Sequence, residues 1–233
     1  MSGSGGFEHR GVLRRARLLC DLVVRVLPVD GAAVLICGKA AEGSTLLCAT
    51  DPMIAQLDDL EFVTAEGPCL QAYRTDVPVL EPDLAGASAT ARWPWFAPEA
   101  VASGARAVFA FPLRAGAVRF GVFWLYRRAP GGLAGRDLNA VLGIAQTAAA
   151  VVLTDVAEHS GEQLDAHFRD SPYGRVEIDR ALGVIAGQRN SDIEQARVLL
   201  RGVAYAQNRS SMSVARDVLT HRLTFPPDPG YGR

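Results

Sequence analysis

The chain has 233 residues, 49% of them hydrophobic, and a formal net charge of −1, which suits two domains with ordinary hydrophobic cores. No apolar run reads as long enough to span a bilayer, and residues 1–10 lack the apolar core of a signal peptide. We therefore expect a cytoplasmic protein with no membrane partner. The cysteines are far apart and lack CxxC spacing, which argues against a zinc site and, in a reducing compartment, against structural disulfides. They are Cys20, Cys37, Cys48 and Cys69.

The first part of the chain predicts a short tail followed by helices and strands. Residues 1–9 are rich in Gly and Ser and are expected to be disordered. An apolar face predicts a helix over 10–27, which Pro28 ends. Further apolar runs predict an antiparallel hairpin with its turn at 42–44, and then two short helices. The strands are expected over 32–37 and 45–50, and the helices over 52–60 and 66–73.

The next part of the chain completes this domain. A short run with a proline predicts an edge strand over 77–80, and residues 84–98 read as a loop ahead of a helix that ends near Ser103. Two strong strands follow, over 107–113 and 119–126. About five antiparallel strands with helices from both ends imply an α+β fold.

A linking helix is expected over 135–158, as the last element of a domain that spans 10–157. Two apolar faces run along it. The first alternates four- and three-residue steps, which is typical of a helix that pairs with a copy of itself and so predicts a homodimer. The alternative is that one side packs on the sheet, and the two are compatible because the helix has a second apolar face. The residues are Leu138, Leu142, Ala145, Ala149, Val152 and Val156 for the first face, and Val141, Ile144, Ala148 and Val151 for the second.

The domain over 10–157 resembles a GAF domain, a cytoplasmic sensory module. The resemblance rests on the matching stretches 66–70, 79–84, 91–93, and 111–113 ahead of 120–122. It implies an antiparallel sheet with flanking helices and a small-molecule ligand, but it names neither the ligand nor a cofactor.

Five residues are candidates to line a ligand pocket in this domain: Cys69, Tyr73, Trp93, Phe111 and Trp124. Cys69 lies near a predicted helix N-terminus, where the helix dipole lowers a thiol pKa and raises its reactivity. The alternative for Cys69 is a small buried residue that packs under the helix. Core packing is likewise the alternative for Tyr73 and Trp93.

A hinge is expected over 158–172, and three amphipathic helices follow within 173–225, ahead of a disordered tail over 226–233. Apolar residues recur at three- and four-residue spacing from Ile178 to Leu223. Ser191 or Asp192 can cap the second helix, and residues 208–211 supply a stop and a new cap. Short connections predict that the three helices bury their stripes in a compact bundle.

An exposed strip is predicted on the second helix of this bundle. Arg197, Arg201, Tyr205 and Asn208 follow one another at steps of four, four and three residues. Arginine offers a planar fork for phosphate or base edges, and tyrosine offers a stacking surface. Residues 172–223 include eight Arg and five acidic residues, so this segment has a net charge of +3, although the whole chain has −1. A solvated helix face is the plain alternative.

The run from Ala181 to Leu219 resembles an ANTAR domain, the three-helix RNA-binding module of bacterial transcription antiterminators. Matching residues lie in all three helices, although Arg197 stands where the family usually has an aromatic residue. Together the two resemblances cover nearly the whole chain and imply a regulator of the actinobacterial GAF-ANTAR type. The implied function is antitermination, in which the protein binds tandem hairpins in a nascent transcript. The predicted RNA-binding residues are Arg197, Arg201, Tyr205, Asn208, Arg209 and Arg216.

Catalysis has no visible residue constellation, so we expect neither an enzyme nor a metal site. The four histidines are scattered, and no phosphate-binding loop or nucleophile elbow appears. Two other classes stay open for the bundle: a DNA-binding regulator, because residues 192–223 also suit a helix-turn-helix, and a module that binds only proteins.

Overall fold

The computed structural model describes residues 14–37, 44–160, 162, 176–207 and 209–226. The expected hairpin turn except Ser44, nearly all of the expected hinge and both expected tails except Pro226 lie outside these residues. The strands are β1 Gly31–Cys37, β2 Ser44–Ala49, β3 Val79–Glu81, β4 Ala107–Ala115 and β5 Val118–Arg127. The helices are α1 Arg14–Val26, α2 Pro52–Thr64, α3 Pro68–Thr75, α4 Ala87–Arg92, α5 Phe96–Ala102, α6 Gly135–Glu158, α8 Val176–Arg189, α9 Ile193–Ala206 and α10 Ser211–Leu219.

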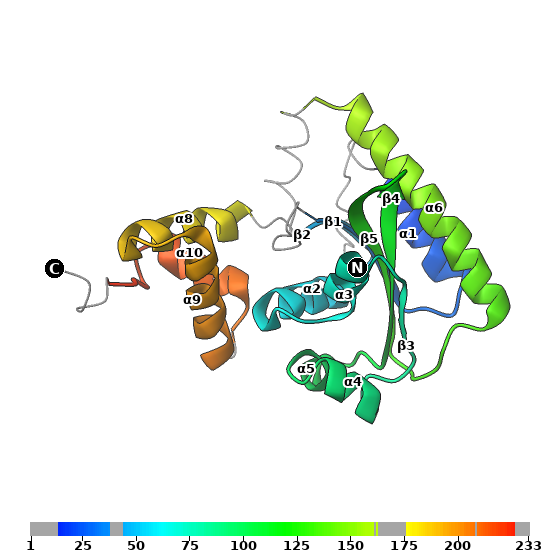
Figure 1. Cartoon of the computed structure of the whole chain (residues 1–233), viewed down its shortest axis with the longest axis horizontal. Coiled ribbons are helices and arrows are strands. Elements are labelled where there is room, and N and C mark those ends of the chain that lie inside the picture. Colours follow the sequence, from blue (N-terminus) through cyan, green and yellow to red (C-terminus); the bar gives the residue numbers. More distant parts are fainter. Residues whose placement is uncertain (1–13, 38–43, 161, 163–175, 208, 227–233) are drawn as a thin grey trace, which may run out of the picture.

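The five strands form one antiparallel sheet in the order β2-β1-β5-β4-β3, which confirms the predicted sheet. Because successive side chains of a strand point to opposite faces, β5 contributes to two cores. Val122, Trp124 and Tyr126 face α2, α3 and α5, whereas Phe123 and Leu125 face α1 and α6. The sheet is therefore covered by helices on both sides (Figure 1).

Helices α1 and α6 lie side by side on one face of the sheet (Figure 1). Arg15 of α1 joins the two, because its guanidinium is 2.9 Å from the buried carboxylate of Asp155 on α6. Ala145, Ala149 and Val152 of the predicted dimer seam are buried here against the protein's own core, so the prediction that they face a second copy was wrong. Their small size lets α6 lie close to α1 and β4.

Helix α6 also corrects the expectation that no segment is long enough to cross a membrane. Among the described residues, α6 alone is long and apolar enough to do so by length and composition. A core helix passes the same test, and Val141, Ala148 and Val152 of α6 are buried within the domain. Packing on α1 and β4 thus accounts for the buried third of the apolar window of α6.

Helix α2 is held at its N-terminus by Asp51. One carboxylate oxygen accepts a hydrogen bond from the backbone N–H of Ile54 at 3.1 Å, which caps the helix, and the other accepts from the Tyr126 hydroxyl of β5 at 2.7 Å. At the other end, Glu61 accepts from the backbone N–H of Cys69 at 2.7 Å and so caps α3. Gly67 leaves room for the Glu61 side chain, which a Cβ at that position would overlap.

The segment 84–98 differs from the predicted loop. It contains α4 and the start of α5, and Trp93 and Phe96 pack edge to face in the core with ring centroids 6.2 Å apart. Periodicity did not predict α4, because a helix of six residues has too few repeats of an apolar stripe.

Helices α8, α9 and α10 form the predicted bundle with a core of its own. Ile178, Ile185, Leu200, Val214 and Val218 are all buried in it. Asp192 caps α9 by accepting from the Gln195 N–H at 2.7 Å, and Ser210 caps α10 by accepting from the Ser213 N–H at 3.1 Å. Ile193 is one of the apolar residues that recur between Ile178 and Leu223, but it is exposed at the start of α9.

Replacing Phe123 with Ala should lower the free energy of unfolding by about 3–5 kcal/mol, because the fully buried ring fills the core between β5 and the layer of α1 and α6. Urea unfolding followed by circular dichroism measures the change. Val118→Ala, at the exposed start of β5, is the control and should change stability by no more than about 0.5 kcal/mol. Equal effects of the two substitutions would contradict the core packing.

Candidate nucleic-acid interface

The predicted strip lies on α9, but part of it is covered. Arg197, Arg201 and Tyr205 follow at four-residue steps along one side of the helix. Arg197 is only 8% exposed, Arg201 is half-buried and Tyr205 is 50% exposed. The expectation of a fully exposed strip was therefore wrong for the two arginines. Asn208 lies outside the described residues.

Helix α2 of the N-terminal domain covers the two arginines (Figure 1). The Phe62 ring receives both guanidinium groups, with Arg201 Cζ 4.8 Å and Arg197 Cζ 5.8 Å from the ring centroid. These are cation–π distances. Phe62 is itself buried in the core of the bundle although it belongs to the other domain. Trp95 makes an edge contact with Tyr205, with ring centroids 5.7 Å apart at an interplanar angle of 84°.

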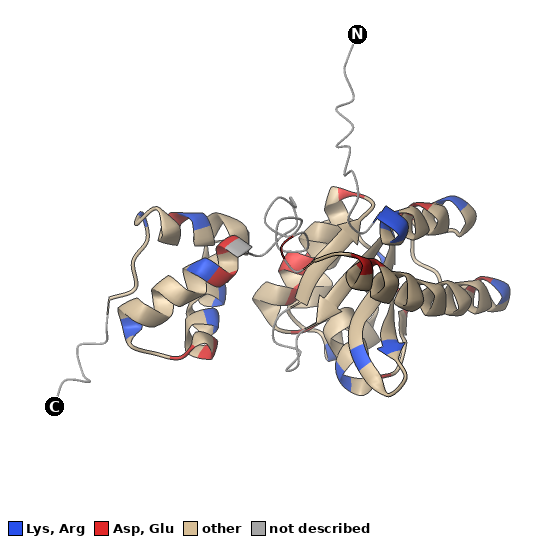
Figure 2. Ribbon diagram, turned by 90° about the horizontal axis from the view of Figure 1, so that it is seen from above, with Lys and Arg blue, Asp and Glu red and all other residues tan. Residues whose placement is uncertain are grey.

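A polar contact joins α2 to the N-terminus of α10. The backbone N–H of Ser211 donates to Oδ2 of Asp59 at 3.2 Å. Free N–H groups and the helix dipole favour negative charge at such a helix start. Three carboxylates lie on α2 with no basic residue. Glu61 is buried at the start of α3, whereas Asp58 and Asp59 lie on the side of the bundle, whose segment 172–223 carries +3. Figure 2 shows acidic residues on the edge of the N-terminal domain nearest the bundle.

The other two predicted arginines are engaged within the bundle. Arg209 donates to the Ser213 hydroxyl at 2.8 Å and forms an ion pair with Asp217. Arg216 donates to Glu177 of α8 at 2.8 Å, and its side chain is 66% exposed. Arg216 therefore keeps most of its surface available to a partner, while Arg209 is held more tightly.

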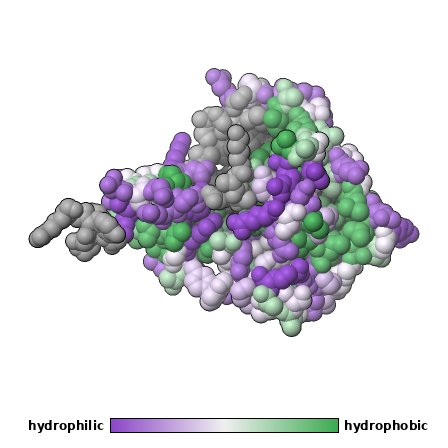
Figure 3. Space-filling model, in the orientation of Figure 1, coloured by the Kyte–Doolittle hydropathy of each residue, from purple (hydrophilic) through white to green (hydrophobic). Residues whose placement is uncertain are grey.

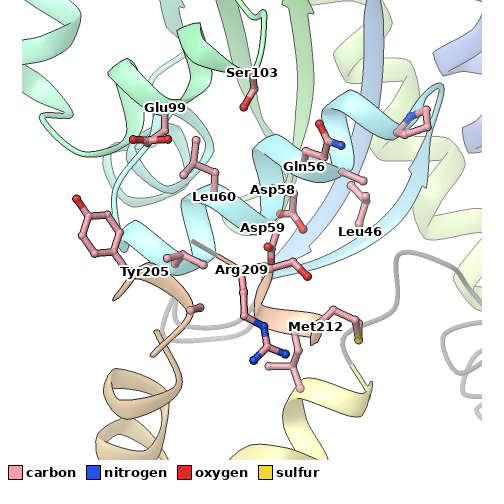
Figure 4. Close-up of a pocket in the computed structure, with 16 residues that line it drawn as sticks. Leu46, Gln56, Asp58, Asp59, Leu60, Glu99, Ser103, Tyr205, Arg209 and Met212 are labelled. Atoms are coloured by element: carbon pink, nitrogen blue, oxygen red, sulfur yellow. The ribbon is translucent and has the colours of Figure 1, made fainter. Parts of the chain in front are cut away.

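Beside these contacts, a cleft of about 880 Å³ separates the two domains. Asp58, Asp59 and Glu99 line it on the side of the N-terminal domain, and Tyr205, Arg209 and Met212 line it on the side of the bundle (Figure 4). Its size lies within the range of small-molecule sites. This cleft was not predicted from the sequence, because its two walls come from distant parts of the chain, residues 46–103 and 178–212.

The predicted ligand pocket inside the N-terminal domain is not formed as expected. Cys69, Tyr73, Trp93 and Trp124 belong to the core between the sheet and α2, α3 and α5, where they pack against one another and their neighbours. Phe111 lies on the opposite face of the sheet, so it was wrongly grouped with them. The error follows from strand alternation: Phe111 of β4 pairs with Phe123 of β5, one residue before Trp124. Phe111 instead borders a smaller hollow of about 310 Å³ beside α6.

Cys69 is buried under α3, which favours its packing role. Burial raises the pKa of its thiol well above the ordinary value, and the nearby Glu61 and Asp58 carboxylates raise it further. The effect of the helix N-terminus, which was expected to lower this pKa, is outweighed because Glu61 already occupies that position. Within the described part of the chain, no group of three His, Cys, Asp or Glu side chains is placed to hold a metal ion.

Family models match two parts of the chain: a GAF domain model over residues 14–152 and an ANTAR domain model over residues 166–219. The first match alone covers more than half of the chain. The chain belongs to the GAF domain family and also carries an ANTAR domain. Both resemblances predicted from the sequence are thereby confirmed. The domain content is that of a signal-responsive regulator and is regulatory rather than catalytic.

Several solved structures are similar to the part of the chain that contains the GAF domain. The photoproduct state of GAF3 from Slr1393 of Synechocystis sp. PCC6803 is 20% identical and covers 67% of this chain and 98% of its own, with a TM-score of 0.48. The GAF domain of a phosphoenolpyruvate-protein phosphotransferase from Coxiella burnetii is 14% identical, and the match covers 65% of this chain and 88% of that one, with a TM-score of 0.48. The second GAF domain of DevS from Mycobacterium smegmatis is 17% identical, and the match covers 61% of this chain and 93% of that one, with a TM-score of 0.44. No curated protein matches the chain.

In the folded GAF domain, Cys69 should resist alkylation at about pH 8, near the ordinary thiol pKa, because its raised pKa keeps the thiol protonated and the core excludes the reagent. Mass spectrometry after timed iodoacetamide labelling measures this. The partly exposed Cys37 is the internal control and should react first. Labelling of Cys69 as fast as Cys37 would show that the thiol is accessible.

Proposed function

We propose that the protein is an RNA-binding transcription antiterminator, in which the ANTAR bundle binds tandem hairpins in nascent RNA under control of the GAF sensor. The observation that supports this most is the line of Arg197, Arg201 and Tyr205 along one side of α9. Two guanidinium groups and a phenol at successive helical turns suit a phosphate backbone and unstacked loop bases. The ANTAR match supports RNA as the class of partner.

The charge of the two domains fits this division of roles. The segment 172–223 has a net charge of +3, while the whole chain has −1, so the cationic residues are concentrated in the ANTAR domain. Such a local excess favours a polyanion without making the whole chain a general binder of nucleic acid. A cytoplasmic location follows from the proposal, because nascent transcripts are made there.

Two bundles suit two hairpins, so we propose that the protein acts as a homodimer. Ala145, Ala149 and Val152 of the predicted seam pack inward, but α6 still exposes the seam residue Leu142, and also Leu153. On the neighbouring α1, Leu18, Leu22 and Val26 are exposed at four-residue steps. Figure 3 shows hydrophobic residues at the surface over α6. A second copy that packs its own α1 and α6 against this surface would link the two RNA sites, which raises their effective concentration without new contacts to RNA.

The GAF domain supplies the signal in this proposal, through a small-molecule ligand. The ligand can alter RNA binding only by its different affinity for two arrangements of the domains. The structure offers the interdomain cleft as a space of suitable size for such a ligand.

Arg201→Ala should weaken binding to a tandem-hairpin RNA about tenfold, because it removes one charge-assisted contact or one stacking surface for a base. Tyr205→Ala should have an effect of similar size. The measurement is a titration followed by fluorescence anisotropy at fixed salt, with a single hairpin and a duplex DNA of equal length as competitors.

The matched control is Arg136→Ala, which removes the same charge from a fully solvated position on α6 of the GAF domain. It should leave the affinity nearly unchanged. Equal binding of tandem hairpins and duplex DNA would instead favour a DNA-binding regulator. Affinity for RNA that survives both substitutions on α9 would mean that another face binds it.

Leu18→Glu combined with Leu22→Glu should convert the dimer to a monomer, because two carboxylates would be buried without partners at the interface. Sedimentation velocity measures the mass, and circular dichroism verifies that the fold is kept. The tandem-hairpin affinity should fall to that of a single hairpin. A wild-type protein that sediments as a monomer at every concentration would contradict the proposed dimer.

A further inference from the structure

We infer that the surface of α9 covered by helix α2 is the surface that RNA uses, and that α2 occupies it by presenting the chemistry of a nucleotide: an aromatic ring in place of a base and a carboxylate in place of a phosphate. The inference rests on the proposed function and adds how the RNA site is regulated. Its consequence is that GAF docking and RNA binding exclude each other.

Phe62 takes the place of the base. An unpaired RNA base is recognised when its flat face stacks on guanidinium and aromatic groups. The Phe62 ring lies against Arg201 and Arg197 at 4.8 Å and 5.8 Å, and the phenol of Tyr205 follows one turn later on the same side of α9. Phe62 is only 5% exposed. It belongs to the GAF domain but is buried in the core of the ANTAR bundle.

Asp59 takes the place of the phosphate. Its carboxylate accepts from the backbone N–H of Ser211, in the first turn of α10. A helix of nine residues with free N–H groups in its first turn favours an anion there. Asp59 lies three residues before Phe62 on α2, so the two side chains point to the same side of the helix. The ring and the anion are thus presented together, as a base and its phosphate would be.

The docked arrangement satisfies the arginines only in part. Nε of Arg197 is buried and has no hydrogen-bond partner within the described residues, and its ion pair with Glu194 is long, at 3.4 Å. A benzene ring accepts no in-plane hydrogen bond, whereas base edges and phosphate oxygens do. RNA can therefore offer Arg197 a bond that Phe62 cannot. This difference lets RNA displace α2 while α2 still holds the site when RNA is absent.

Phe62→Ala in the full chain tests the inference. Removing the ring should raise the affinity for tandem-hairpin RNA about tenfold, equivalent to about 1.4 kcal/mol, since a competing intramolecular contact reduces the apparent affinity. Asp59→Asn keeps the shape of the side chain and removes its charge, so it should raise the affinity several-fold without threatening the fold. The control is Val77→Ala, which also truncates an apolar side chain of the GAF domain but at an exposed position, and it should have no effect.

Trp95→Ala extends the test to the contact with Tyr205 and should also raise the affinity, because Trp95 is largely exposed and is not needed for the core. Adding Arg201→Ala to Phe62→Ala should abolish the gain. Hydrogen exchange of the α9 and α10 amides in the absence of RNA gives a second readout, since Phe62→Ala should speed exchange at Ser211.

The outcomes separate this inference from the proposed function. A wild-type chain that binds the hairpins, with Phe62→Ala, Asp59→Asn and Trp95→Ala no tighter, would overturn the inference and leave the function standing. Binding that is seen only after Phe62→Ala would support the inference most directly. Failure of the wild type and all three variants to bind any hairpin RNA would overturn the proposed function and the inference with it.

Discussion

Helix α2 is packed on two sides at once, and the relation between the two domains depends on this. Ile54 and Leu57 fill the core against the sheet, while Phe62, five residues after Leu57, lies in the core of the ANTAR bundle. Asp51 fixes the start of the helix to β5 through the Tyr126 hydroxyl. The helix is therefore rigidly part of the GAF domain, and any movement of the sheet that shifts α2 also shifts Phe62 against α9.

This double packing explains which parts of the site the sequence could predict. A helix that packs on one side has an apolar stripe, and that stripe located the inner faces of α8, α9 and α10 correctly. The residues left over on α9 were assigned to solvent. This assignment was wrong for Arg197. An amphipathic pattern shows which side of a helix packs in its own bundle, but it does not show whether another domain covers the other sides. The signal that was available lay in α2, where Val63 is an apolar residue on the side of the helix opposite Ile54.

The sheet shows a second limit of sequence reasoning. Alternation within each strand was visible, and it placed the strands themselves correctly. The register between strands decides which residues of β4 lie on the same face of the sheet as a given residue of β5. Phe111, for example, pairs with Phe123. The same limit applies to α6. Its small residues indicate close packing, but they do not identify the partner, which for Ala145 and Ala149 is the protein's own core. Apolar pattern thus predicts the fold well and the composition of a pocket or interface poorly.

The size of the contact between the domains suits a switch. The groups that hold α2 on the ANTAR domain include a cation–π cluster, one edge contact between Trp95 and Tyr205, and one hydrogen bond from a helix N-terminus to Asp59. Each is of a kind that contributes on the order of 0.5–3 kcal/mol. A ligand with a hundredfold preference for one arrangement supplies about 2.7 kcal/mol, which is comparable with such a contact. The position of the ligand then sets the sign of its effect. Under the proposed function, a ligand that bridges both walls of the cleft, from Glu99 to Arg209, would stabilise the docked arrangement and oppose RNA binding, whereas one that moves α2 within the GAF domain would release α9.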